Sequence, residues 1–203
     1  MSELGLFPLP LVLLPTERVP LHIFEERYRE LIGECLESGR EFGLVYADDE
    51  GVRDVGTRAR VTEVLARMAD GRMDILVEGG GRFRLIELTT GRSFHTGDVA
   101  PVEDEVDTAD PESIERALDL FNRLRELTGS DVDVPEADAA QLSFVLAGRV
   151  AFAPEDKLQL LRDLSERSRL TRVCSLLESA MATAKRARRA AERAATNGRV
   201  HLG

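Results

Sequence analysis

The stretch LFPLPLVLLPTERVPLHIFEERY, residues 6–28, decides how this chain begins to fold. Four prolines, at positions 8, 10, 15 and 20, interrupt an otherwise apolar run. Because proline fixes φ and lacks a backbone donor, neither a long helix nor a central strand can occupy this run. We therefore expect an extended, kinked and largely buried segment whose prolines mark sheet edges and bends.

The pattern changes at Phe24, where apolar residues begin to recur at helical spacing. The predicted buried face consists of Phe24, Tyr28, Leu31, Ile32, Cys35 and Leu36. Gly39 is the natural stop, because glycine adopts the left-handed conformation that ends many helices. The stretch thus predicts an extended lead into one amphipathic helix.

Short alternating segments follow this helix and predict strands. They cover residues 41–47, 55–68, 72–78, 82–88 and 94–102. A slip in the alternation near Val64 indicates a β-bulge, and Ala69–Gly71 is typical of a hairpin turn. We expect Gly79–Gly81 to form a tight turn between two strands, because the run lacks the spacing of a dinucleotide-binding loop.

From Asp110 the apolar period becomes helical, with Asp110 as N-cap, Pro111 at the first position and Gly129 as the stop. Three further helices are predicted, one through residues 142–149, one from Pro154 and a long one from about Ser165. The fold class is therefore α+β. We expect a β-rich barrel or sandwich domain with one helix, residues 1–106, followed by a helical bundle, residues 110–197, that ends in a long helix.

The composition excludes several classes of protein. With 43% hydrophobic residues and a net charge of −10, the chain is not typical of a disordered protein or of one whose whole surface binds nucleic acid. No apolar run reaches the length of a membrane span, and Glu3 stands where a signal peptide has basic residues. Cys35 and Cys174 occupy apolar helix positions and are predicted to be buried, reduced thiols, so we expect a cytoplasmic protein with no membrane contact.

Charge is unevenly distributed along the chain. The segment from Lys185 to the end holds six basic residues and one acid, a net +5, which leaves −15 on the first 184 residues. Alanine and arginine favour a helix here. A solvated extension of the last helix is one interpretation, and a contact with nucleic acid or an acidic protein through Lys185–Arg199 is the other.

Five sequence blocks after the opening stretch complete a recognisable series. They are EFGLV at 41–45, VGTRA at 55–59, DGR at 70–72, GRFRL at 81–85 and APEDKLQLL at 153–161. In this order, the chain resembles the N-terminal domain of Lon proteases over about residues 4–184. The resemblance implies a PUA-like β domain followed by a helical bundle, and a role in substrate recognition instead of catalysis.

The catalytic parts of a full-length Lon protease have no counterpart in this sequence. The only lysines are Lys157 and Lys185, and neither follows a glycine as the lysine of a phosphate-binding loop does. Neither has a plausible serine partner for a Ser-Lys peptidase. The resemblance is therefore to a stand-alone copy of the recognition domain, which we expect not to be an enzyme and to need no cofactor.

Other polar residues have structural interpretations that we prefer to catalytic ones. We expect His22 to bond backbone at the junction of strand and helix, and Glu25, Glu26 and Arg27 to form an ion pair that fixes the helix to the sheet. His95 and His201 have no partners at ligand spacing, so no metal site is predicted. Arg82 and Arg84 share one face of a strand, where they meet water or an acidic partner, including the acidic run after Val102.

The leading functional hypothesis is a non-catalytic module that binds unfolded proteins or peptides, in protein quality control. Because clefts between domains commonly bind ligands, we place the site at the junction of the two domains. The candidate binding residues are Arg27, Tyr28, Arg82, Arg84 and Phe94. A protease or chaperone is the expected partner, nucleic-acid binding is the alternative, and a hydrolase would need a titratable pair in a pocket.

Overall fold

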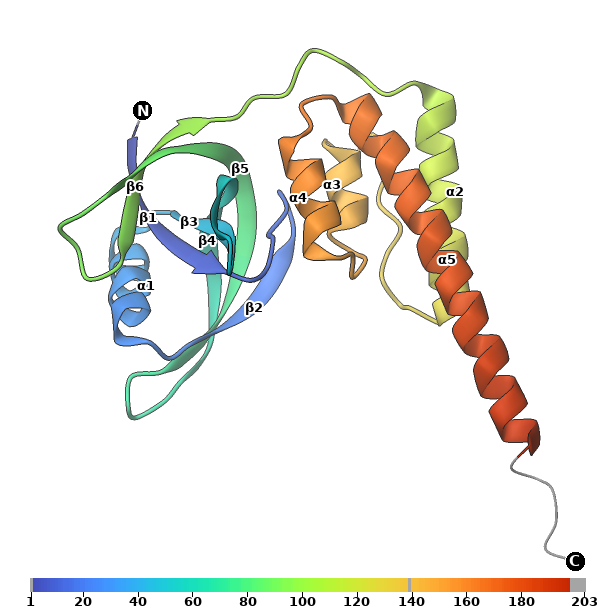
Figure 1. The fold of residues 1–203 in the computed structure, drawn as a ribbon, viewed down its shortest axis with the longest axis horizontal. Helices are drawn as coiled ribbons and strands as arrows, with labels where there is room; N and C mark the ends of the chain where they lie inside the picture. Colours follow the sequence, from blue (N-terminus) through green and yellow to red (C-terminus); the bar gives the residue numbers. More distant parts are fainter. Residues whose placement is uncertain (1, 139, 198–203) are drawn as a thin grey trace, which may run out of the picture.

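Strands gather in one half of the molecule and helices α2–α5 in the other (Figure 1). The computed structural model describes residues 2–138 and 140–197. Within these residues the strands are β1 Ser2–Leu9, β2 Arg18–Ile23, β3 Phe42–Asp48, β4 Gly51–Arg67, β5 Met73–Thr89 and β6 His95–Pro101. The helices are α1 Glu26–Ser38, α2 Pro111–Thr128, α3 Leu142–Ala147, α4 Pro154–Arg162 and α5 Glu166–Asn197. The predicted α+β class, a β-rich part followed by a bundle that ends in a long helix, is confirmed.

Five of the strands close into a ring. Hydrogen-bonded neighbours follow the order β5, β4, β3, β1 and β6, and β6 returns to β5. β1 and β3 run parallel, which requires a crossover connection, and β2 with α1 provides it. The buried residues of α1, Tyr28, Leu31, Ile32 and Cys35, pack into the same core as the strands. Closure protects the strand edges that an open sheet would expose.

The prolines of the opening stretch lie where a missing backbone donor costs least, as predicted. Pro20 lies in β2, which pairs with β5 at the edge of the sheet. Pro8 lies in β1 beyond the point where the pairing with β6 ends, and at this position β1 pairs with β3. Pro10 and Pro15 fall in the connection between β1 and β2. Edge strands and the connections between strands are the places where β-sheet proteins tolerate proline.

The connection between β1 and β2 contributes to two hydrophobic cores. Leu13 is buried with the strands and α1, whereas Val12 and Leu14 are buried with the helical bundle. The Oγ1 of Thr57 donates a hydrogen bond to the Leu13 carbonyl at 2.6 Å, which fixes this segment on β4. The opening stretch is therefore shared between barrel and bundle.

Gly79–Gly81 do not form the predicted tight turn, because β5 runs through them as one continuous strand. The first part of β5 pairs with β2 and the last part with β6, so the glycines lie where the partner changes. The N–H of Thr16 donates to the Gly79 carbonyl at 2.8 Å, and the N–H of Gly79 donates to the Glu17 carbonyl at 2.9 Å. A Cβ on Gly79 would lie 2.1 Å from the Leu14 carbonyl oxygen. Close approach of the β1–β2 connection, and not a turn, requires glycine at this position.

The other predictions for the strands agree with the structure. β4 shifts register against β5 at three places, one of them between Val64 and Ala66, where the bulge was predicted. Residues 68–72 connect β4 to β5, and Gly71 has a φ of 88° in this turn. The bulges add the local bend that a long strand needs to follow a closed ring.

Helix α1 begins at Glu26, two residues after Phe24. The prediction that Phe24 is buried is wrong. Its side chain is 60% exposed and its ring stacks on His22, with 5.9 Å between centroids. Because Glu25 is the extended N-cap, the helical period does not orient Phe24. Gly39 ends the helix in the left-handed conformation, as expected.

The helical bundle follows the predicted order with one shortened member. Asp110 caps α2 by accepting a hydrogen bond from the N–H of Ser113, and Gly129 ends this helix. The second predicted helix is only the six-residue α3, so Arg149 lies outside it. Gly148 ends α3, and the N–H of Arg149 turns back to the Leu146 carbonyl. Glycine has a low helix propensity, which accounts for the early end.

Helix α5 is 32 residues long, and only its first part is buried. Its predicted apolar stripe packs in the bundle core through Leu170, Val173, Cys174, Leu177 and Met181. Beyond Ala184 the described side chains are exposed, and Figure 1 shows the helix extending past the bundle. None of the helices in residues 2–138 and 140–197 has both the length and the apolar character to cross a membrane.

Candidate functional site

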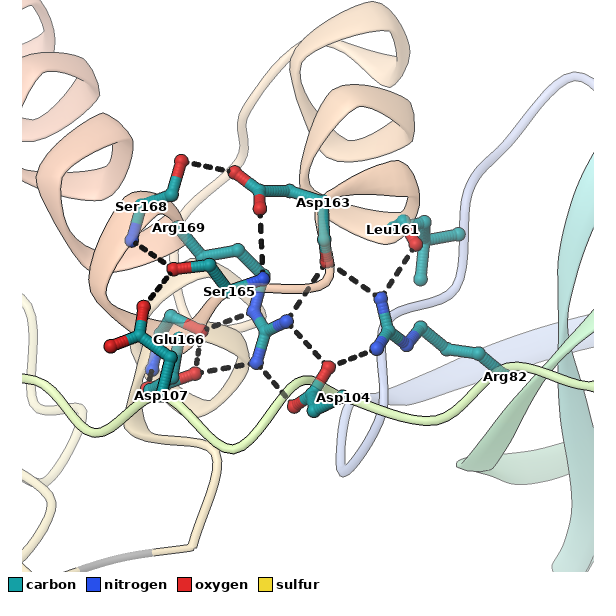
Figure 2. Close-up of polar contacts among 10 residues, drawn as sticks. Arg82, Asp104, Asp107, Leu161, Asp163, Ser165, Glu166, Ser168 and Arg169 are labelled. Carbon is teal, nitrogen blue, oxygen red and sulfur yellow. Dashed lines mark hydrogen bonds and ion pairs between the residues drawn. The ribbon is translucent and has the colours of Figure 1, made fainter.

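A polar network joins the barrel to the bundle. Arg82 projects from β5 into the bundle, and its Nη1 donates to the carbonyls of Leu161 and Asp163, both at 2.8 Å. Its Nη2 donates to Asp104, in the segment that connects β6 to α2. Figure 2 shows Arg82 reaching these groups from the sheet. With 4% of its surface exposed, Arg82 is a buried residue of the junction.

Arg169 of α5 completes this network from the other side. Its Nη1 and Nη2 donate to the two carboxylate oxygens of Asp104 at 2.7 and 2.6 Å, a bidentate pair. Nη2 also donates to Glu166 at 2.6 Å, and Nε donates to the Ser143 hydroxyl at 3.0 Å. Asp104 is thus the shared anion of two buried guanidinium groups (Figure 2).

The electrostatics of this junction keep Asp104 ionised. Burial raises the pKa of Asp104, but the hydrogen bonds and charge of Arg169, together with the charge of Arg82, outweigh burial and hold that pKa below its usual value. Both guanidinium groups also lie over the ring of Phe144, Arg169 at 4.4 Å and Arg82 at 5.3 Å from its centroid. With its buried donors occupied, this network fixes the bundle on the barrel and offers no free group to a ligand.

A hollow, which we call the junction hollow, lies at the edge of this junction, between the β1–β2 connection and α3. It has a volume of about 720 Å³ and is lined by Thr16, Glu17, Arg18, Glu78, Val132, Val145, Gly148 and Arg149. Its ionic groups are mostly paired, Arg18 with Glu78 at 2.7 Å and Glu17 with Lys157 of α4. The hollow is polar and internally satisfied, which makes it a poor site for an apolar peptide.

A more apolar groove lies on the bundle and shares Val132 and Arg149 with the junction hollow. α2, α5 and the segment 149–153 enclose about 570 Å³. The lining residues are Phe121, Leu124, Arg125, Thr128, Ser130, Val132, Arg149, Val150, Ala151, Phe152, Ala153, Asp156, Leu176, Ser179, Ala180, Thr183 and Ala184. We call this surface the bundle groove. Apolar walls with a few polar groups at the rim are the usual composition of a ligand-binding groove.

Comparison with known proteins places this architecture in one family. The family model for the ATP-dependent protease La (LON) substrate-binding domain matches residues 3–179. The chain belongs to the Lon substrate-binding domain family. The resemblance noted from the sequence blocks is thereby confirmed.

Individual relatives agree with this assignment. The Lon protease of Brucella abortus biovar 1 (strain 9-941) is 25% identical over 187 residues, which cover 83% of this chain and 23% of that protein. The chain thus spans about a quarter of the length of this relative. The crystal structure of a Lon N-terminal domain protein from Xanthomonas campestris matches with a TM-score of 0.68 and 27% identity, over 86% of this chain and 98% of the other. The N-terminal domain of a Mycobacterium avium complex Lon protease has the same fold, with a TM-score of 0.68 and 19% identity over 87% and 98% of the two chains.

The candidate residues predicted for this Lon-type domain do not form one site. Arg27 and Tyr28 lie together at the start of α1, where the guanidinium of Arg27 is 4.6 Å from the centre of the tyrosine ring. The ring of Tyr28 is buried and stacks on Phe7. Arg27 pairs with Glu25, two residues before it, at 2.7 Å. This ion pair is local to the helix start, so the prediction that it fixes the helix to the sheet is wrong.

Arg82 and Arg84 remain close but have different roles. Arg82 is buried and pairs with Asp104, which lies in the acidic run after Val102 as one interpretation of the sequence had it. Arg84 is exposed and pairs with Asp54 at 2.7 Å, and Asp54 also accepts a hydrogen bond from Arg162 of α4. Arg82 therefore connects barrel and bundle directly, whereas Arg84 pairs within the barrel with Asp54, the residue that also binds Arg162 of the bundle.

Phe94 lies on another side of the barrel. It is buried beneath the guanidinium of Arg92, which is 4.6 Å from the ring centre. It lines a hollow of about 710 Å³ between α1, β1 and β6, together with Leu4, Leu31 and Cys35. Burial, and then the charge of Glu34, raises the pKa of the Cys35 thiol to about 11, so this thiol is protonated near neutral pH.

His22 has a different partner from the predicted backbone group. Its Nδ1 lies 2.6 Å from Oδ1 of Asp74 on the neighbouring strand β5. Strand alternation explains this, because Leu21 and Ile23 point into the core and His22 points outward. This histidine–carboxylate pair is exposed on the outer face of β2 and β5, and it lines neither the junction hollow nor the bundle groove. Across residues 2–138 and 140–197, no group of three His, Cys, Asp or Glu side chains is arranged to hold a metal ion.

The bundle groove was not identified from the sequence. Leu124, Ala180 and Ala184 have the helical spacing of core residues, so periodicity alone assigns them to the interior. A weaker signal was available in Val150–Ala153, an apolar connection between two helices. Apolar residues in a short connection must be covered by something, and here they form one wall of the groove.

Proposed function

We propose that the chain is a non-catalytic module that binds apolar segments of unfolded proteins or peptides in the bundle groove. The observation that carries this proposal is the apolar groove of about 570 Å³ formed by α2, α5 and residues 149–153. Membership of the Lon substrate-binding domain family supports a role in recognition. A groove of this volume accommodates a few apolar side chains of an extended segment.

The bundle groove replaces the domain junction as the proposed site. At the junction, Arg82 and Arg169 are buried and bonded to Asp104 and to backbone carbonyls, so a peptide would have to displace these bonds. Leaving a buried guanidinium without its anion is strongly unfavourable. In the groove, by contrast, Phe152 and Leu176 are only partly buried and can lose further exposed surface to a ligand.

A substitution that fills the groove tests the proposal. Thr183 lines the groove on α5 and is exposed, so Thr183→Trp should occupy the space that a peptide needs. Ser175→Trp is the matched control, because Ser175 is exposed on the same helix and does not line the groove. We expect Thr183→Trp to weaken binding of fluorescently labelled apolar peptides by about ten-fold or more in anisotropy titrations. Equal affinities for the two variants would contradict the proposed site.

The partner proteins belong to the same proposal. Because the Brucella relative is a Lon protease of which this chain spans 23%, a separate protease or a chaperone is the expected recipient of bound substrates. The cytoplasm remains the predicted location. Size-exclusion chromatography of the chain with purified Lon protease, with and without a bound peptide, would test a direct complex.

Nucleic-acid binding through Lys185–Arg199 stays the second candidate. Lys185, Arg186, Arg188, Arg189 and Arg193 are exposed on α5, which favours it, and Arg199 lies outside the described residues. The net charge of −10 opposes it, because the rest of the surface repels phosphate. Binding of this kind would weaken steeply as salt is added.

A further inference from the structure

The basic end of α5 is a strongly charged surface that the groove proposal does not yet use. Its exposed cations are Lys185, Arg186, Arg188, Arg189 and Arg193. At 100° per residue, Arg186, Arg189 and Arg193 lie on one side of the helix. The positive charge is therefore concentrated along one edge of the helix and not spread around it.

This basic edge is continuous with the bundle groove. Thr183 and Ala184 line the groove, and Lys185 and Arg186 follow them directly. Nη2 of Arg186 donates to the Thr183 hydroxyl at 3.0 Å, so a groove residue and the first arginine of the edge are in contact. This contact joins the rim of the groove at Thr183 to the near end of the basic edge.

The groove itself adds two cations to the same region. Arg125 donates to Asn122 at 3.0 Å, and Arg149 donates to the Asp133 carbonyl. Among the described residues, no salt bridge joins a carboxylate to Arg125, Arg149, Lys185, Arg186, Arg189 or Arg193, whereas Arg188 pairs with Glu192. The residues that line the groove include one acid, Asp156, against the two arginines. Within residues 2–138 and 140–197, these six cations therefore differ from the many arginines that are paired with a carboxylate.

The rest of the molecule has the opposite charge. The first 184 residues carry a net charge of −15, against +5 for the segment that follows. The field of the protein therefore attracts a negatively charged ligand at this end and repels it elsewhere. Charge complementarity of this kind selects partners and fixes their orientation.

Resting on the proposed function, we propose that the preferred ligand is a peptide with an apolar segment next to an acidic one. The apolar segment occupies the bundle groove, and the acidic residues lie along Arg186, Arg189 and Arg193. Clusters of arginine are a common device for recognising acidic motifs. The groove supplies the affinity for apolar side chains. The basic edge selects, among apolar peptides, those that carry acidic residues next to the apolar segment.

Two labelled peptides of equal length test this inference on the full chain. Both carry the same apolar half, and the other half holds four glutamates in one peptide and four glutamines in the other. We expect the glutamate peptide to bind about ten-fold more tightly at low ionic strength, and the preference to fall as salt screens the charges. The variant Arg186→Glu/Arg189→Glu/Arg193→Glu should abolish or reverse this preference, through loss of affinity for the glutamate peptide.

A matched variant and a competitor separate the outcomes. Arg53→Glu/Arg60→Glu/Arg72→Glu reverses three charges on the barrel and should keep the preference for glutamate. Equal affinity of the two peptides for the wild-type chain would overturn the inference and leave the groove proposal standing. Binding of neither peptide would overturn both. Displacement of the glutamate peptide by single-stranded RNA at stoichiometric concentration would overturn the acidic-peptide assignment in favour of nucleic acid.

Discussion

At the scale of single residues, Asp104 is expected to have a large effect on stability. Its carboxylate accepts hydrogen bonds from two buried arginines that come from opposite halves of the molecule. Asp104→Ala should lower the free energy of unfolding by about 3 kcal/mol, because it leaves Arg82 and Arg169 buried without their shared anion. Urea denaturation followed by circular dichroism measures this loss.

Asp54→Ala is the control for this prediction. Asp54 of β4 also joins barrel to bundle, through Arg162 of α4, and it pairs with Arg84 within the barrel, but these ion pairs are exposed to solvent. Exposed pairs contribute less than about 1 kcal/mol. Equal losses for the Asp54 and Asp104 variants would show that burial of the network has no energetic role.

The same carboxylate predicts how stability depends on pH. Burial raises the pKa of Asp104, and the hydrogen bonds and charges of Arg169 and Arg82 more than offset this, so its folded-state pKa lies below its usual value. The unfolded value is about 3.9. The stabilisation from Asp104 is therefore complete well above pH 4 and is lost as the pH falls through the folded-state pKa. The difference in unfolding free energy between wild type and Asp104→Asn should shrink between pH 7 and pH 2.5, and a difference independent of pH would contradict the assignment.

At the scale of elements, the glycines of β5 give a paired test. A Cβ on Gly79 would lie 2.1 Å from the Leu14 carbonyl oxygen, whereas a Cβ on Gly81 would have no atom within 4 Å. We expect Gly79→Ala to destabilise the protein by about 2 kcal/mol or more, because the backbone of the β1–β2 connection must move. Gly81→Ala should change stability by less than about 1 kcal/mol. Denaturant midpoints of the two variants decide this, and similar midpoints would mean that the contact with Leu14 is relaxed at little cost.

Local signals in the sequence predicted most elements of the fold. Capping predicted the helix ends at Asp110, Gly129 and Gly39. Alternation predicted the strand from Met73 to Val77. Both effects depend on residues that are near one another in the sequence. Gly79–Gly81 and Phe24 were misjudged for the opposite reason. Gly79 allows the close approach of a segment more than 60 residues earlier in the chain, and the exposure of Phe24 depends on where the N-cap falls.

The candidate site was less predictable than the fold. A junction between the halves was foreseen, but the pairing of Arg82 with Asp104 and Arg169 depends on distances in the folded chain. The bundle groove depends on how residues 149–153 lie against α2 and α5, which periodicity does not encode. The basic segment was visible in the sequence, whereas its continuity with the groove required the structure.

At the scale of the whole molecule, barrel and bundle should unfold together. Leu14 belongs to the barrel's opening stretch but is fully buried in the core of the bundle, beside Val12 and Val55. Leu14→Ala should cost about 2 to 5 kcal/mol. Because the core is shared, a substitution that destabilises it should raise the native-state hydrogen-exchange rates in both halves.

The measurement compares slowly exchanging amides in β3 and in α2. We expect Leu14→Ala to lower their opening free energies by the same amount. A loss confined to α2 would show that residues 1–106 and 110–197 are independently stable domains, as the sequence pattern alone suggested.

Helix α5 also has a mechanical consequence. Its 32 residues contain neither glycine nor proline, so it behaves as a stiff rod of about 48 Å. Near the start of the helix, Arg169 is bonded to Asp104. The second half of the helix, beyond Met181, lies outside the hydrophobic core. A ligand held at the far end is therefore kept at a fixed distance and direction from the barrel. The length of α5 thus sets the distance of its far end from the barrel. Inserting or deleting one helical turn would change the orientation of that end little and would shift it by about 5 Å along the helix axis.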